Sequence, residues 1–237
     1  MTATIKQYLP DALTCCNLLS GCIATYLAIR GSASLALTFI IVGAVFDFLD
    51  GMTARLLGVS SPIGKQLDSL ADDITFGLAP AAIVFVELKI IDYPAWMEQS
   101  RSFLPFVAFL IAVFSAVRLA KFNVDSRQKM TFIGLPTPAN ALFWGSLTAS
   151  GVLHGIPACY LLYIILLLVL VSCWLLVSEL PMFAMKFSHW GWHNNEVKYC
   201  FAVLALLLII LLGLEASLWI IVALYVVISL FTRGKKA

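Results

Sequence analysis

The chain of 237 residues is 62% hydrophobic and only 12% charged, and its mean hydropathy is +0.98. This composition excludes an ordinary soluble domain and predicts an all-α polytopic membrane protein with no room for a large domain outside the membrane. The formal net charge of +2 is small, and basic residues beside membrane helices follow from topology and contact with lipids. Membrane lipids are therefore expected partners and nucleic acid is not.

Apolar segments predict about eight transmembrane helices. Residues 130–178 contain no Asp, Glu, Lys or Arg, and one helix of that length would be about twice as long as a bilayer core is thick. The chain must therefore turn back, and residues 154–157 (His-Gly-Ile-Pro) are the natural place. The same reasoning places the spans near residues 11–30, 33–56, 64–90, 102–122, 136–153, 157–179, 198–214 and 216–232. Residues 179–195, which include the aromatic residues Phe187, Trp190 and Trp192, are expected to lie along the membrane surface.

The basic residues predict the orientation of these spans. With eight spans both termini lie on one side, and that side carries all but three of the fifteen Lys and Arg residues. The three exceptions are Arg30, Lys89 and Arg101. The positive-inside rule therefore predicts that both termini are cytoplasmic. Glu87 falls near the opposite face, where it is expected only to solvate a helix end.

A polar stripe marks the cytoplasmic end of the second span. Asp47, Asp50, Gly51, Ala54 and Arg55 recur at spacings of three and four residues. That spacing places them along one face of a helix. Carboxylates and an arginine therefore share this face.

A second polar face is predicted at the start of the third span. The chain is expected to break at Gly58 and to restart at Ser61-Pro62, with the serine as N-cap and the proline in the first helical position. Gly64, Asp68 and Asp72 then follow at intervals of four. A short loop can fold this face against the first.

Carboxylates gathered in a poorly solvated place need a strong counter-charge. We predict Mg²⁺ or Mn²⁺, as a pair of ions, because hard divalent cations take oxygen ligands and two of them about 4 Å apart can clamp a phosphoryl group for in-line displacement. The predicted ligands are Asp47, Asp50, Asp68 and Asp72. Gly51 and Gly64 would let a diphosphate approach the backbone, and Arg55 would neutralise its oxygens.

These positions match the pattern D-x-x-D-G-x-x-A-R-x8-G-x3-D-x3-D without a gap or substitution, so the chain resembles the CDP-alcohol phosphotransferase family. The resemblance implies a membrane enzyme that transfers a phosphatidyl or similar group from a CDP-linked donor to an alcohol and releases CMP. It also implies a homodimer and a six-helix core, here residues 1–180. Residues 181–237 would add an interfacial segment and two further spans.

Longer stretches are similar to the phosphatidylserine synthase branch of that family. They are PDALTCCN (residues 10–17), DSLADDITFGLAP (68–80), VRLAKFN (117–123), FIGLPTPA (132–139) and SELPMFAMKF (178–187). The resemblance implies CDP-diacylglycerol as donor, L-serine as acceptor and a bacterial cytoplasmic membrane, with the active site on the cytoplasmic side. Asp73 directly follows the last motif aspartate, where the resemblance implies an apolar residue, and its role is open between capping or solvation and the metal site.

Donor-binding residues are expected around the motif. Thr14 and Asn17 in the first span either contact the nucleotide or satisfy a neighbouring helix, and the resemblance favours the nucleotide. The residues predicted to bind CDP-diacylglycerol are Thr14, Asn17, Gly51, Ala54, Arg55, Ser61 and Gly64.

Acceptor-binding residues are expected at the end of the fourth span. Arg118, helped by Lys121 and Asn123, is predicted to bind serine, because a guanidinium can hold a carboxylate through two parallel hydrogen bonds. The positive-inside bias alone could also explain the two basic residues. Asp72 is predicted to act in addition as general base towards the serine hydroxyl.

Two other functions compete with this prediction. A related enzyme would use glycerol 3-phosphate or an inositol derivative as acceptor, which should require a larger basic cluster at the cytoplasmic mouth. An ion-coupled transporter would place its carboxylates near the membrane midplane, between structural repeats. The aspartates lie instead towards the helix ends, and no repeat is visible in the sequence.

Overall fold

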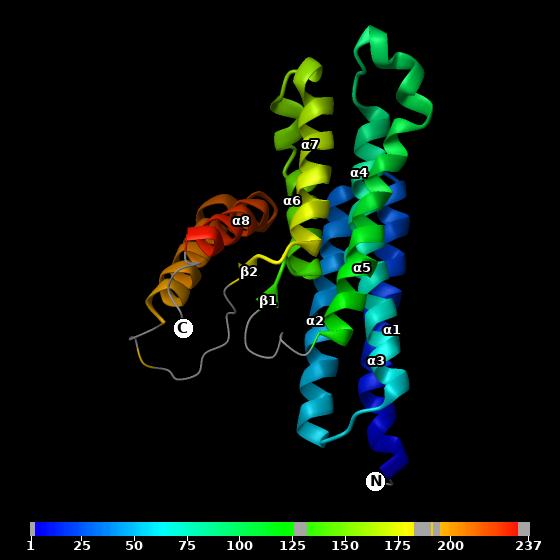
Figure 1. The fold of residues 1–237 in the computed structure, drawn as a ribbon, viewed down its shortest axis with the longest axis vertical. Coiled ribbons are helices and arrows are strands. Elements are labelled where there is room, and N and C mark those ends of the chain that lie inside the picture. The colour runs from blue at the N-terminus through cyan, green and yellow to red at the C-terminus, as the bar shows by residue number, and fades with distance from the viewer. Residues whose placement is uncertain (1–2, 126–131, 183–190, 192–194, 232–237) are drawn as a thin grey trace.

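The protein is almost entirely helical in the computed structural model, which describes residues 3–125, 132–182, 191 and 195–231 (Figure 1). Within these residues, six helical stretches are long and apolar enough to cross a membrane. The predicted all-α polytopic fold is confirmed. The predicted surface segment 179–195 lies largely outside the described residues.

The first three spans form a bundle that contains the motif. Its elements are α1 (Ala3–Ile29), α2 (Ala33–Leu57), α3 (Pro62–Asp72), the π-helix η1 (Asp73–Leu78) and α4 (Ala79–Ile90). The third predicted span is thus one helical rod that contains a π-helical turn. Helices α1 and α2 run side by side along their length, and α3 packs against α1 (Figure 1).

The second half of the chain packs against this bundle. Its elements are η2 (Ala95–Ser102), η3 (Leu104–Phe109), α5 (Leu110–Val124), β1 (Phe132–Ile133), α6 (Thr137–Ala149), η5 (Val152–Gly155), α7 (Ala158–Val177), β2 (Pro181–Met182) and α8 (Glu196–Phe231). The two short strands pair antiparallel and tie the connection before α6 to the connection after α7.

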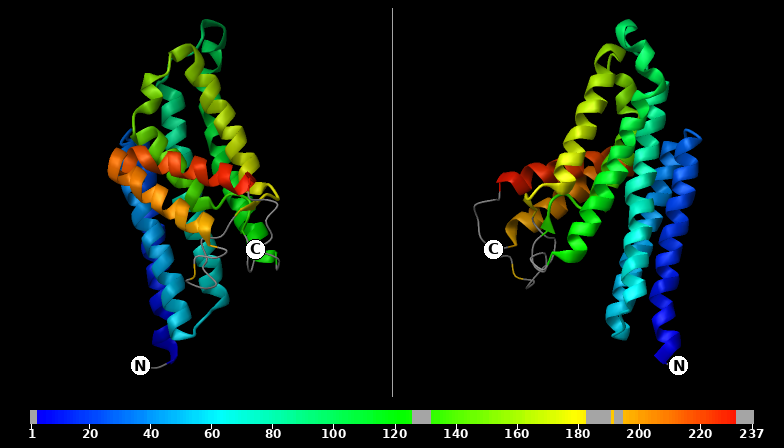
Figure 2. Two further views of the ribbon diagram at one scale, coloured as in Figure 1. Left: turned by 90° about the vertical axis from the view of Figure 1, so that its left-hand side faces the viewer. Right: turned by 45° about the vertical axis from the view of Figure 1, so that its right-hand side comes forward.

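The fifth predicted span is shorter than expected, while the last two form one element, α8, that breaks close to the predicted connection. Helix α6 has 13 residues, about 20 Å at 1.5 Å per residue, because the chain turns at Gly151 with a left-handed φ of 70°. Element α8 consists of two helices that meet at Gly213, because the φ of 77° at this residue interrupts a right-handed helix. The two arms of α8 run obliquely to the bundle (Figure 2), and α8 contacts α6.

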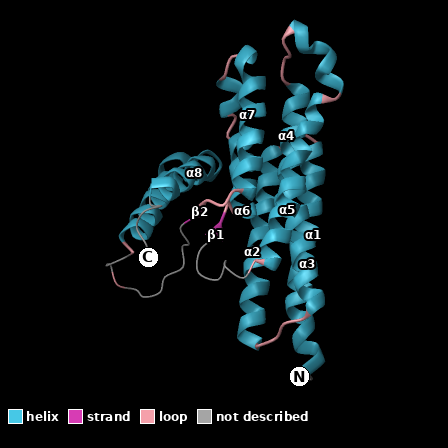
Figure 3. Ribbon diagram, viewed as in Figure 1, coloured by secondary structure: helices cyan, strands magenta, loops and turns pink. Residues whose placement is uncertain are grey.

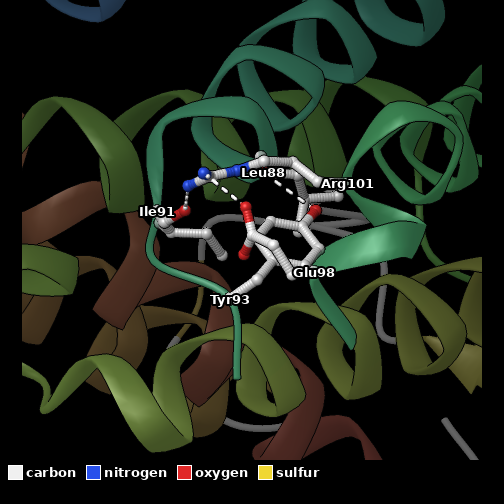
Figure 4. A network of polar contacts seen from close by, with 5 residues as sticks. All are labelled: Leu88, Ile91, Tyr93, Glu98 and Arg101. Atoms are coloured by element: carbon white, nitrogen blue, oxygen red, sulfur yellow. Dashed lines mark hydrogen bonds and ion pairs between the residues drawn. The ribbon is translucent and has the colours of Figure 1, made fainter. Parts of the chain in front are cut away.

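A polar network fastens the end of α4 that lies away from the motif. Arg101 Nη2 donates to the Ile91 carbonyl over 2.7 Å and Nη1 donates to Glu98 Oε1 over 2.9 Å, while Tyr93 Oη donates to the Leu88 carbonyl over 3.0 Å (Figure 4). Burial raises the pKa of the Tyr93 phenol, which favours its protonated, donating form.

One expectation for this end of the bundle is wrong. Glu87 does not solvate a helix end, because its side chain is buried and the residue is only 4% exposed. Helix α4 continues for three residues beyond it to Ile90, so the carboxylate stays inside the bundle.

Candidate active site

The motif aspartates lie on α2 and α3, two helices joined by a loop in the lower part of the bundle in Figure 3. Asp47 and Asp50 lie on α2 and Asp68 lies on α3, and these three offer carboxylate oxygens that lie within 4.8 Å of one another. Asp72 lies one turn beyond Asp68 and interacts electrostatically with Asp47 and Asp68. The structure thus brings together the two polar faces expected from the sequence.

The connection between the two faces follows from local chemistry. Gly58 ends α2 in the left-handed conformation, with φ 63°, and its N–H donates to the carbonyls of the last helical turn. Ser61 then caps α3, since its Oγ accepts from the Gly64 N–H over 2.8 Å, and Pro62 opens the helix. The predicted break and restart are confirmed.

Two residues of α1 donate hydrogen bonds to the motif carboxylates. Thr14 Oγ1 donates to Asp50 Oδ2 over 2.6 Å, and Asn17 Nδ2 donates to Asp72 Oδ1 over 3.1 Å. Thr14 and Asn17 are buried, at 3% and 0% exposed. Their hydrogen bonds therefore orient the carboxylates of Asp50 and Asp72. Their predicted contact with the nucleotide stays a prediction.

The π-helix η1 sets the direction of the residues after Asp72. Thr75 Oγ1 donates to the Asn17 carbonyl over 3.0 Å. A Cβ at Gly21 would overlap Thr75, and a Cβ at Gly43 would lie 2.5 Å from Thr75 Cγ2. Glycines in α1 and α2 therefore let η1 pack closely enough to hold Asn17. Such π-turns recur at functional sites, and nothing in our sequence reasoning indicated this one.

Asp73 points in a different direction from Asp72. It opens η1, and its Oδ1 is buried without a hydrogen-bond partner. A Cβ at Gly77 would lie 2.7 Å from Asp73 Oδ1 and 3.1 Å from Ser115 Cβ. The Asp73 side chain therefore lies along η1 towards α5. It is not one of the three clustered carboxylates.

A cavity of about 300 Å³ opens beside the aspartates. Five of the seven residues predicted to bind the donor line it: Thr14, Gly51, Ala54, Ser61 and Gly64. Sequence reasoning missed five further lining residues: Pro10, Asp11, Val59, Ser60 and Lys65. Their positions in the sequence could have indicated them, because each lies within four residues of a residue predicted to bind the donor.

The other predicted donor-binding residues and the two glycines have different surroundings. Asn17 and Arg55 do not line the cavity, but Arg55 is exposed, and its Nη2 would lie 4.0 Å from a Cβ at Gly51. Space over Gly51 is thus open, as expected. Gly64 differs, because a Cβ there would lie 2.7 Å from Asp11 Oδ1 and 2.9 Å from Ser61 Oγ. A methyl group at this position would therefore crowd the Asp11 and Ser61 side chains where α1 packs on α3.

Arg118 lies on α5 close to the carboxylates. It is 7% exposed, its Nη1 lies 3.5 Å from Thr137 Oγ1, and it interacts electrostatically with Asp72. A second cavity, of about 330 Å³, is lined by both basic and acidic side chains. Its charged lining residues are Arg118, Lys121, Asp125 and Glu179.

Asn123 is separated from this second cavity. Its Nδ2 donates to Ser69 Oγ over 2.7 Å, and its carbonyl accepts from Lys65 Nζ over 3.1 Å. It therefore fastens the end of α5 to α3, on the side where Lys65 lines the first cavity. Its predicted contact with serine stays a prediction.

The carboxylate cluster fits a divalent cation. In the described part of the chain no Lys or Arg forms an ion pair with Asp47, Asp50, Asp68 or Asp72. Opposed oxygens in a Mg²⁺ shell lie about 4 Å apart, slightly less than the 4.8 Å limit of the cluster. Small side-chain movements would therefore bring these oxygens onto one ion.

The sequence model of the CDP-alcohol phosphatidyltransferase family matches residues 7–185, a segment that contains both cavities and all four aspartates. The chain belongs to this family. As a family member it is a membrane transferase of phospholipid biosynthesis, and the transporter alternative is wrong.

Individual relatives place the chain within the CDP-alcohol phosphatidyltransferases. The chain is 33% identical to a CDP-diacylglycerol–serine O-phosphatidyltransferase of Bacillus subtilis, over 80% of this chain and 95% of that protein. It is 30% identical to a protein of the same name from Mycobacterium leprae, over 74% of this chain and 58% of that one. An archaetidylserine synthase of Methanothermobacter thermautotrophicus is 31% identical, over 69% of this chain and 67% of that one. The predicted resemblance to the phosphatidylserine synthase branch is confirmed.

Proposed function

We propose that this chain transfers the phosphatidyl group of CDP-diacylglycerol to the hydroxyl of L-serine, giving phosphatidylserine and CMP. The observation that carries the proposal is the cluster of motif carboxylates at the wall of a cavity that also contains the predicted donor-binding residues. The names of the relatives support serine as the acceptor.

The donor would lie in the first cavity with its diphosphate beside Gly51, where the nearby guanidinium of Arg55 can reach the phosphate oxygens. Divalent cations bound by Asp47, Asp50, Asp68 and Asp72 would supply positive charge to the diphosphate and polarise the phosphorus under attack. Thr14, through its hydrogen bond to Asp50, keeps a carboxylate oriented towards this position.

Asp72 would take the proton of the serine hydroxyl as the new oxygen–phosphorus bond forms and the bond to CMP breaks. The Asn17 amide donates to Oδ1 of Asp72, which leaves Oδ2 to receive the proton. Positioned proton transfer of this kind contributes about 10² to 10⁴ in rate.

Serine would enter from the second cavity, with its carboxylate on Arg118. The same cavity is lined by Asp125 and Glu179 as well as by Lys121. A wall of mixed charge suits a zwitterionic amino acid. It suits a dianionic phosphate ester such as glycerol 3-phosphate less well, because the carboxylates would repel it.

The arrangement in the membrane is part of the proposal. We infer a core of residues 1–180 that carries the chemistry and an added unit of residues 181–237. The added unit packs on the core through Val222 and Tyr225, which share one apolar cluster with Leu135 and Leu175. We also infer a homodimer in a bacterial cytoplasmic membrane, with both termini and the site on the cytoplasmic side, as the distribution of basic residues predicts.

The test is CMP release by the purified full-length protein, with CDP-diacylglycerol, a divalent cation and one candidate alcohol at a time. Serine should support turnover, while glycerol 3-phosphate and inositol derivatives should not. Chelation with EDTA should abolish release, and added Mg²⁺ or Mn²⁺ should restore it. Turnover with glycerol 3-phosphate but not with serine would refute serine as the acceptor. Full activity in EDTA would refute the requirement for a divalent cation.

A further inference from the structure

A third cavity, of about 550 Å³, lies at the end of the bundle away from the aspartates. The connection from α1 to α2, the last turn of α4 and the end of α6 line it. Asp50 lies 17 residues beyond Ala33, the first residue of α2, and 17 helical residues span about 26 Å. This cavity is therefore separate from the proposed site of phosphatidyl transfer.

Two buried polar groups in this cavity lack hydrogen-bond partners. Glu87 is 4% exposed and Thr148 is 8% exposed, and neither Glu87 Oε1 nor Thr148 Oγ1 has a hydrogen-bond partner. His154 Nε2 lies 3.7 Å from Glu87 Oε1, and the His154 side chain is 63% exposed. A buried carboxylate is stable when a cation pairs with it, and the cavity has room for one beside the exposed imidazole.

Another part of the lining of the same cavity favours an anion. Ser32, Ala33 and Ser34 line the cavity at the start of α2, and Ser32 makes no side-chain cap. The first N–H groups of a helix have no partner within the helix and carry the positive end of its dipole. The cavity therefore offers one wall for an ammonium and one wall for a phosphate.

The rim of the cavity is apolar and faces outwards. Leu35 and Ile90 both line it and are 53% and 60% exposed. On a membrane-spanning bundle, such side chains contact lipid. A ligand that carries acyl chains could place its polar end in the cavity and its chains against these residues. A small soluble ion would leave these apolar side chains without a contact.

We propose that this cavity binds the head group of a phospholipid that carries a primary ammonium, with the ammonium on Glu87 and the phosphate at the start of α2. Thr148 accepts a hydrogen bond from the ammonium. The site is independent of the proposed transfer reaction, since none of its lining residues lines either of the other two cavities.

The experiment is thermal unfolding of the purified full-length protein in detergent, titrated with dihexanoyl phosphatidylethanolamine. The melting temperature should rise and saturate, because a ligand that binds only the folded state stabilises it. Dihexanoyl phosphatidylglycerol, which lacks the ammonium, and ethanolamine, which lacks the phosphate and chains, should need at least tenfold higher concentrations. An equal effect of the glycerol lipid or of ethanolamine would overturn the proposal.

Variants locate the effect in this cavity. Glu87→Gln keeps the shape and removes the charge, and it should raise the half-saturating lipid concentration at least tenfold. Glu98→Gln is the matched control, since Glu98 lies at the same end of the bundle outside the cavity, paired with Arg101, and it should bind as the parent does. If Glu87→Gln does not fold, Thr148→Val should still weaken binding several-fold. Parental binding by whichever of these two variants folds would overturn the proposal.

Discussion

Replacing Thr14 by valine tests how the site holds its carboxylates. Valine has nearly the shape of threonine but cannot donate the 2.6 Å hydrogen bond to Asp50. Because Thr14 and Asp50 are only 3% and 6% exposed, water does not readily replace the lost donor. We therefore expect Thr14→Val to weaken the binding of the divalent cation.

The size of the effect follows from the bonds that Thr14 makes. A hydrogen bond to a charged group is worth about 1.5 to 3 kcal/mol, which corresponds to about ten- to 150-fold in an equilibrium constant. The same hydroxyl also lies 3.1 Å from the Pro10 carbonyl, and one proton cannot serve both acceptors at once. The lower end of the ten- to 150-fold range therefore applies, and the metal concentration for half-maximal activity should rise about tenfold.

The assay is CMP release against Mg²⁺ concentration, repeated against CDP-diacylglycerol concentration at saturating metal. Thr25→Val is the matched control, because Thr25 Oγ1 donates only to the Gly21 carbonyl, farther along the same helix. Its metal dependence should equal that of the parent. If Thr14→Val instead raised the KM for CDP-diacylglycerol and left the metal dependence unchanged, Thr14 would contact the nucleotide and the reasoning above would be wrong.

Three further predictions concern proton transfer, the acceptor and packing. Asp72→Asn should lower kcat by about 10² to 10⁴, whereas Asp73→Asn should lower it much less; equal losses would contradict their different directions in the structure. Arg118→Lys should raise the KM for serine about ten- to 100-fold by removing a charge-assisted bond and leave the KM for CDP-diacylglycerol unchanged; the reverse pattern would reassign Arg118 to the donor. Gly64→Ala should lose about 1 to 3 kcal/mol of stability through overpacking, as measured by denaturant unfolding. Gly51→Ala should keep its stability and raise the KM for the donor. A fully stable Gly64→Ala would show that Asp11 and Ser61 can move aside.

The sequence by itself determined the helical membrane fold, the motif and the turn between its two halves. Hydropathy, helical spacing and capping act over a few residues, so they can be interpreted without knowing what packs nearby. The same holds for Gly58 and Ser61, whose roles depend only on their own backbone and on neighbours within four residues.

Only the tertiary structure decided which groups each polar side chain meets. Thr14 and Asp50 are 36 residues apart in sequence, and Asn17 and Asp72 are 55 apart, so no local pattern could pair them. The π-turn after Asp72, which turns Asp73 away from the cluster, depends on close packing against glycines of two other helices. The burial of Glu87 likewise depends on neighbours from α1, α2 and α6. Such contacts are decided by the packing of whole helices, because a side chain's partner is whatever the folded chain brings within a few ångströms of it.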